Sequence, residues 1–155
     1  MIKTAIALGV LVTATLLMKK SGMSYRQSVL KTLYPAIMWT SKSSGKKQIQ
    51  INKNNSAPTV SFYTLTTKDI SGNDFNFSTL KGKKVLIVNT ASDCGFTAQY
   101  EALEKLSQQF GDKLVILGFP SNDFKEQETK DNADIVNFCK KNYGVNFPLM
   151  EKSIV

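Results

Sequence analysis

The sequence predicts an α/β domain with parallel strands, preceded by a hydrophobic N-terminal helix. Residues 85–89 and 114–119 are short apolar runs with the composition of buried strands. Each is followed by a segment with helical features, over 98–110 and 131–142. A third strand is expected to open at 147–149. The order strand–helix–strand–helix–strand favours an α/β layer with parallel pairing.

The elements of this domain are expected from residue 58 onward. Residues 60–66 and 75–77 flank Ser71-Gly72-Asn73, which is typical of a small hairpin. Asp131 is a plausible N-cap for the second helix, and Gly144 lies just beyond its end. The first helix carries its apolar residues on one stripe that we expect to be buried: Ala102, Leu103, Leu106 and Phe110.

The positive charge of the chain belongs to its N-terminal part. Residues 1–54 carry nine Lys or Arg and no Asp or Glu. Residues 55–155 carry the other 11 basic residues and all 12 acidic ones, a net charge of −1. The formal charge of +8 at pH 7 is therefore no property of the globular part. A basic segment beside an apolar stretch indicates attraction to a membrane surface, so we expect no nucleic-acid partner.

Residues 1–20 are interpreted as a signal or anchor segment that would bring the chain to a membrane. An uncharged stretch over 4–18 lies between Lys3 and the pair Lys19-Lys20. It is shorter than the roughly 20 residues of a spanning helix, but it matches a signal-type hydrophobic region. An uncleaved anchor is the first interpretation, and a processed signal peptide is the second.

Residues 21–57 are expected to form a basic amphipathic tether and linker. Residues 24–39 have helical spacing and could lie flat on a membrane or form a loosely ordered tether. Pro35 predicts that this helix is divided into two short pieces. The flanking Lys and Arg residues favour a cytoplasmic domain, whereas a signal-like start favours export, so the membrane side stays open.

Composition excludes several kinds of catalysis. The chain has no histidine, which excludes Ser-His-Asp and Cys-His catalysis and the usual zinc sites. Its two cysteines, Cys94 and Cys139, are too few for a disulfide-stabilised scaffold. Cys94 ends a polar turn between an apolar strand and a helix, where peptide N–H groups and the helix dipole favour a thiolate. The turn therefore predicts a reactive thiol.

Four motifs carry a resemblance to a known family. They are NTASDCGFTAQY (89–100), LGFPSN (117–122), FKEQE (124–128) and FCKKNYGVNFP (138–148). In order and spacing they resemble the glutathione peroxidase family over about residues 58–152. The resemblance implies a thioredoxin-like fold and reduction of hydrogen peroxide or organic hydroperoxides in oxidative-stress defence. It implies no metal and no cofactor.

The resemblance also implies roles for individual residues. Cys94 matches the peroxidatic position, whose thiolate attacks the peroxide and leaves a sulfenic acid. Gln127 matches the active-site glutamine, a neutral amide that can hydrogen-bond the sulfur or the leaving oxygen. Cys139 matches the resolving cysteine of the thioredoxin-dependent branch, which would require its helix to unwind locally. Without that role, glutathione would be the expected reductant. The supporting residues of the motif are Asn89, Gly95 and Thr97.

The chain also departs from the family pattern. Ser121 stands where many members have a cysteine, and Lys125-Glu126 replace small residues before Gln127. The family continues with a further helix, further strands and a Trp-Asn-Phe motif, whereas the chain ends at Val155. We expect a partial domain over 58–155 that is poorly stable and weakly active alone.

Three other functions compete with a peroxidase. A membrane-anchored thiol–disulfide oxidoreductase would need Cys-x-x-Cys, and Thr97 occupies the position of the second cysteine. A membrane-anchored redox sensor would pass on the oxidation of Cys94 without turning over. The last alternative is an inactive fragment.

Overall fold

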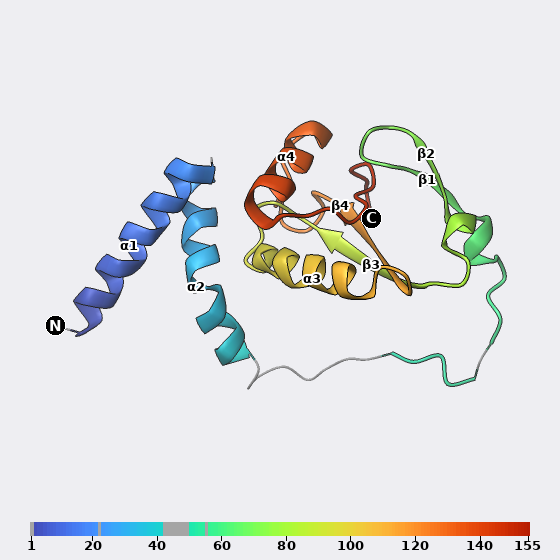
Figure 1. The fold of residues 1–155 in the computed structure, drawn as a ribbon, viewed down its shortest axis with the longest axis horizontal. Helices are drawn as coiled ribbons and strands as arrows, with labels where there is room; N and C mark the ends of the chain where they lie inside the picture. The colour runs from blue at the N-terminus through green and yellow to red at the C-terminus, as the bar shows by residue number, and fades with distance from the viewer. Residues whose placement is uncertain (1, 22, 42–49, 55) are drawn as a thin grey trace.

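The computed structural model describes residues 2–21, 23–41, 50–54 and 56–155 (Figure 1). Two N-terminal helices precede an α/β domain in which two helices pack on a two-stranded parallel sheet. A hairpin lies at the opposite end of that domain from the N-terminal helices (Figure 1). The helices and strands are α1 (Ile2–Ser21), α2 (Tyr25–Ser41), β1 (Thr66–Lys68), β2 (Asp74–Asn76), β3 (Lys84–Thr90), α3 (Tyr100–Phe110), β4 (Leu114–Pro120) and α4 (Asn132–Tyr143).

The two pairings confirm the predicted α/β arrangement. β3 and β4 pair in parallel, with register from Lys84 opposite Leu114 to Thr90 opposite Pro120. β1 and β2 form the predicted antiparallel hairpin, closed by Gly72 at φ +87°. The first hairpin strand is shorter than expected because Phe62–Thr64 form a 3-10 turn, whereas β2 has the expected length.

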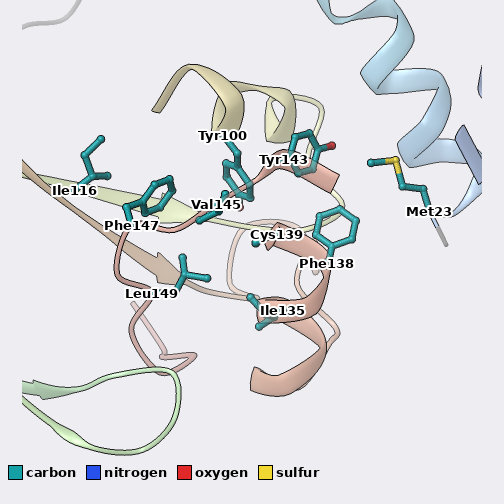
Figure 2. Close-up of a cluster of buried hydrophobic side chains, with 10 residues drawn as sticks. All are labelled: Met23, Tyr100, Ile116, Ile135, Phe138, Cys139, Tyr143, Val145, Phe147 and Leu149. Carbon is teal, nitrogen blue, oxygen red and sulfur yellow. The ribbon is translucent and has the colours of Figure 1, made fainter. Parts of the chain in front are cut away.

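The sheet separates two apolar clusters. Along β4, Ile116 contributes to the cluster beneath α3 and α4, whereas Leu117 contributes to the cluster beneath the hairpin. This alternation follows from the period of two in a strand. The larger cluster joins the sheet to both helices (Figure 2). Its buried members are Met23, Tyr100, Ile116, Ile135, Phe138, Cys139, Tyr143, Val145, Phe147 and Leu149.

Two expectations about burial are only partly correct. Ile87 in β3 is 49% exposed, although its apolar run predicted a buried strand. In α3, Leu103 and Leu106 pack against the core, but Ala102 and Phe110 are exposed. Tyr100 and Glu104 are the buried residues of that helix. Tyr100 packs against Tyr143 of α4, and Glu104 accepts hydrogen bonds from Asn146 N and Phe147 N.

The third strand is reduced to isolated bridges. Leu149 bridges Gly118 in parallel, and Met150 bridges Asp69 in antiparallel fashion. Pro148 has no N–H to donate, so the contact with β4 uses its carbonyl, which accepts from Gly118 N at 2.9 Å. A Cβ on Gly118 would lie 2.6 Å from the Leu149 side chain, which explains the glycine at this close approach.

Both predicted ends of α4 are confirmed. The Asp131 side chain accepts a hydrogen bond from Asp134 N at 2.8 Å, as an N-cap does. Gly144 adopts the left-handed conformation at φ +67°, and its N–H donates to the carbonyls of the last turn.

The N-terminal helices form a layer of their own on the domain. α1 packs along α2, and among its described side chains five large aliphatic ones are 47–64% exposed: Ile6, Leu8, Leu11, Val12 and Leu16. In the part of the chain described, no helix combines the length and hydrophobicity needed to cross a bilayer. The prediction of two short pieces is wrong, since α2 continues through Pro35 as one helix. Gln27 and Ser28 of α2 are buried against the domain.

Candidate active site

The loop that carries Cys94 begins where β3 ends, at the carboxyl edge of the sheet. Cys94 is half-buried, and the Phe96 N–H donates to its sulfur at 3.5 Å. A 3-10 turn over Thr97–Gln99 then leads into α3. The predicted strand, turn and helix around the thiol are therefore present.

Thr97 fixes the shape of this loop. Its hydroxyl oxygen accepts a hydrogen bond from Cys94 N at 3.1 Å. The same hydroxyl lies 2.9 Å from the Ala91 carbonyl and 2.8 Å from the Cys94 carbonyl, to either of which it can donate. The buried Tyr100 hydroxyl also donates to Ala91 O, at 3.2 Å. Gly95 leaves open space, since a Cβ there would contact nothing within 4 Å.

Cys94, Gln127 and Asn89 line one open cavity of about 170 Å³, together with Thr90, Ala91 and Phe124. The Gln127 side chain makes no hydrogen bond with another described residue, so its amide is available to a ligand. The structure thus brings together three of the residues predicted from the sequence. The cavity is large enough for a small oxidant beside the sulfur.

The Gln127 segment is tied to the Cys94 loop through Glu128. The Glu128 Oε2 oxygen accepts from Ser92 N at 2.7 Å and from Ser92 Oγ at 2.8 Å. Beside it, Asp93 N donates to Gln127 O at 2.9 Å, and Glu128 N donates to Asn122 Oδ1 at 2.9 Å. Sequence reasoning assigned no role to Glu128 or Ser92. Their place within the matched motifs was the only available signal.

Glu128 is a buried carboxyl group, only 1% exposed. Burial raises its pKa above the usual value, while its bonds to Ser92 oppose that rise. Its second oxygen, Oε1, is buried and has no hydrogen-bond partner in the described residues. Burying this carboxyl group costs desolvation free energy, which its hydrogen bonds to the Cys94 loop offset in part.

The two residues that directly precede Gln127 adopt an uncommon backbone conformation. Lys125 and Glu126 have φ values of 59° and 53°, in the left-handed region that favours glycine. Side chains in this region cost about 1 kcal/mol or more each. The replacement of small residues noted in the sequence thus places backbone strain directly before Gln127.

Cys139 lies apart from this cavity. It sits in α4, is 2% exposed, and both cysteines are free thiols. Burial raises the pKa of Cys139 to about 12, and the nearby Glu128 carboxylate adds to the rise. In this conformation the thiol stays protonated and shielded, so Cys139 and Cys94 do not form one reactive pair.

A second side of the Cys94 loop is covered by α2. The Gln27 side-chain amide donates to Ser92 O at 3.1 Å. Gln27 also forms a capping box with Ser24, because Ser24 N donates to Gln27 Oε1 and Gln27 N donates to Ser24 Oγ. The spacing Ser-x-x-Gln could have revealed the start of this helix. It could not have revealed the contact with Ser92.

No group of three or more potential metal-ligating side chains occurs among the residues that the structure describes.

Comparison with known proteins identifies the family. The glutathione peroxidase family model matches residues 62–155, more than half of the chain. The chain therefore belongs to the glutathione peroxidase family, and its α/β layer fits the thioredoxin-like fold expected from the motifs.

Curated relatives are similar over the same region. A glutathione peroxidase-like peroxiredoxin of Schizosaccharomyces pombe is 56% identical over 92 residues, covering 59% of this chain and 58% of the relative. One of Chlamydomonas reinhardtii is 58% identical over 95 residues, covering 61% and 59%. A solved structure described as Trgpx in apo form is 37% identical, with a TM-score of 0.44 over 61% of this chain and 55% of that one. The chain spans about three fifths of the length of the curated relatives it matches.

Two substitutions of Glu128 distinguish the effect of its hydrogen bonds on stability from the effect of its negative charge. Glu128→Ala removes the acceptor for Ser92 and is expected to lower the free energy of unfolding by about 2 kcal/mol. Glu128→Gln keeps an acceptor oxygen and removes the buried charge, so it should be far milder at pH 7. Chemical denaturation checks both variants. Equal losses for the two would contradict a role through hydrogen bonding to Ser92.

Proposed function

We propose that the chain is a thiol peroxidase that reduces hydroperoxides at Cys94. The supporting observation is that Cys94 and Gln127 line the same open cavity, with Asn89 at its wall. Membership of the glutathione peroxidase family supports the same chemistry. The function would be protection against peroxides.

The first step would oxidise sulfur and cleave the peroxide bond. The Cys94 thiolate attacks one oxygen of ROOH, the O–O bond breaks, and the leaving oxygen takes a proton to become ROH. Cys94 becomes a sulfenic acid. The Gln127 amide can donate a hydrogen bond to the oxygen that develops negative charge, without altering the charge of the site.

The second step would form a disulfide between the two cysteines. The Cys139 sulfur attacks the Cys94 sulfenic acid, the S–O bond breaks, and the thiol proton leaves with the hydroxyl as water. A disulfide requires Cα atoms about 5.5 Å apart. Because the thiol of Cys139 is buried and protonated in α4, local unwinding must precede the attack. A dithiol protein such as thioredoxin would then reduce the disulfide, and glutathione is the alternative reductant.

The site does not favour a thiol–disulfide oxidoreductase. That activity uses a second cysteine three residues after the first, where this chain has Thr97. The Thr97 hydroxyl is engaged with the backbone of Ala91 and Cys94 and holds the loop. A sensor would share the first step, and only turnover with a reductant separates it from an enzyme.

We also propose that the N-terminal helices bind a membrane surface. α1 exposes aliphatic side chains along its length, with Leu8 at 64% and Leu16 at 62%. Trp39 on α2 is 80% exposed and suits a membrane interface. The basic residues of 1–54 would be attracted to anionic lipids. The side of the membrane is left open.

One equivalent of hydroperoxide should convert the reduced chain to a Cys94–Cys139 disulfide, detected by alkylation and non-reducing mass spectrometry. Cys139→Ser should stop at a Cys94 sulfenic acid, and Cys94→Ser should not react. A Cys94 sulfenic acid beside a free Cys139 in the unmodified chain would contradict the resolving role. A reduced Cys94 would contradict the peroxidase itself.

Gln127→Ala is expected to slow the oxidation of Cys94 by hydroperoxide about 10- to 100-fold, because a donor to the leaving oxygen is lost. The rate can be followed in Cys139→Ser by quenching with an alkylating reagent. Gln109→Ala, at an exposed position of α3, is the matched control and should leave the rate unchanged. An unchanged rate in Gln127→Ala would remove this residue from the mechanism.

Replacement of Leu8 and Leu16 by Gln should weaken binding to vesicles of phosphatidylcholine and phosphatidylglycerol about tenfold or more. Co-sedimentation measures the bound fraction. Ile154→Gln changes an exposed side chain near the other end and serves as the control. Equal binding by all three proteins would contradict a membrane role for α1.

A further inference from the structure

Helix α2 lies outside the residues matched to the family, yet it packs beside the domain (Figure 1) and contacts the loop that carries Cys94. Its first turns face the domain, with Gln27 and Ser28 buried. The space between α2, Cys94 and Gly95 is too narrow for a water molecule. Arg26 pairs with Asp93 at 3.4 Å beside the Gln27–Ser92 contact. Helix α2 is therefore packed on the Cys94 loop.

One residue of α2, Lys31, reaches the end of α4. Its Nζ donates to the Asn142 carbonyl at 2.6 Å and lies 4.4 Å from the centre of the Tyr143 ring. It also pairs with Glu101 of α3 at 3.0 Å. The Lys31 side chain is 20% exposed, so water screens these contacts less than at an open surface.

Lys31 contacts the C-terminal turn of α4, and the backbone of Cys139 is hydrogen-bonded to that turn. Gly144 N donates to Lys140 O, and Val145 N reaches Cys139 O at 3.4 Å, which closes this last turn. The Asn142 carbonyl belongs to the terminal group of carbonyls that have no partner within a helix. An ammonium group at a helix C-terminus also interacts favourably with the helix dipole. Lys31 therefore stabilises the closed form of the last turn of α4, which would have to open before Cys139 attacks oxidised Cys94.

We propose that Lys31 is a positioning residue that sets how fast Cys139 reaches oxidised Cys94, by holding the last turn of α4 closed. The proposal rests on the resolving role given to Cys139 above. The hydrogen bond and ion pair of Lys31 go to Asn142 and Glu101 and not to either sulfur, so we expect its effect on the second step. The first step, attack of Cys94 on the peroxide, takes place in the cavity on the Gln127 side of the loop.

Lys31→Met keeps the aliphatic stem and removes the ammonium group. We expect disulfide formation about fivefold faster than in the unmodified chain, with the rate of Cys94 oxidation unchanged. Both rates come from one experiment, in which the reaction with hydroperoxide is quenched by alkylation at successive times and analysed by mass spectrometry. Lys31→Arg retains the charge and should restore the slower disulfide rate.

Two further variants act as controls. Lys105→Met removes an exposed lysine from α3 and should change neither rate. Glu101→Gln removes the ion-pair partner of Lys31 while leaving Lys31 in place, and should give a smaller acceleration, which also covers the case in which Lys31→Met folds poorly. Disulfide formation in Lys31→Met and Glu101→Gln at the unmodified rate, or slower, would overturn the proposal.

Amide hydrogen exchange in the reduced protein separates this proposal from the one on which it depends. Lys31→Met should speed exchange at Gly144 and Val145, whereas Lys105→Met should not. If peroxide oxidises Cys94 but no variant forms a disulfide, the resolving role fails. Unchanged exchange at these amides would show that Lys31 does not hold the last turn of α4 closed. That result would overturn the proposal whether or not the disulfide forms.

Discussion

The candidate site depends on one buried carboxyl group, that of Glu128. Its bonds to Ser92, with the adjacent bond from Asp93 to Gln127, join two segments 36 residues apart in the sequence. One segment carries the thiol of Cys94, and the other carries the Gln127 amide that lines the same cavity. Burial of a carboxyl is costly, and it is tolerated here because both donors of Ser92 converge on one oxygen. These bonds extend the alignment that the pairing of β3 with β4 begins, and they fix the Cys94 loop against the Gln127 segment.

Local patterns allowed much of the structure to be predicted. Short apolar runs indicated β3 and β4, and Asp131 and Gly144 marked the ends of α4 correctly. The motif around Cys94 and Gln127 indicated residues that do share a cavity. Contacts between distant segments were beyond such reasoning. Lys31 and Asn142, for example, are 111 residues apart, and no local period connects them. The exposure of Ile87 likewise depends on what packs above β3.

The two cysteines lie in opposite environments. Cys94 is in a turn at the sheet edge, where an oxidant can reach it, whereas Cys139 is enclosed among aromatic and aliphatic side chains (Figure 2). Enclosure keeps Cys139 protonated and out of contact with peroxide, which protects it from direct oxidation. If Cys139 resolves oxidised Cys94 as proposed, the same enclosure would add a conformational step before the disulfide forms. Protection of Cys139 and the speed of the proposed cycle would then oppose each other.

The docking of α2 on the end of α4 couples two equilibria, the binding of α2 to the domain and the opening of the last turn of α4. If bound α2 favours the closed turn of α4 by some factor, then opening of that turn weakens the binding of α2 by the same factor. A disulfide that keeps the turn open would thus favour release of the N-terminal helices from the domain. Conversely, any surface that captures α2 would favour the open turn. With the proposed disulfide, the redox state of the two sulfurs and the docking of the N-terminal helices would be thermodynamically coupled.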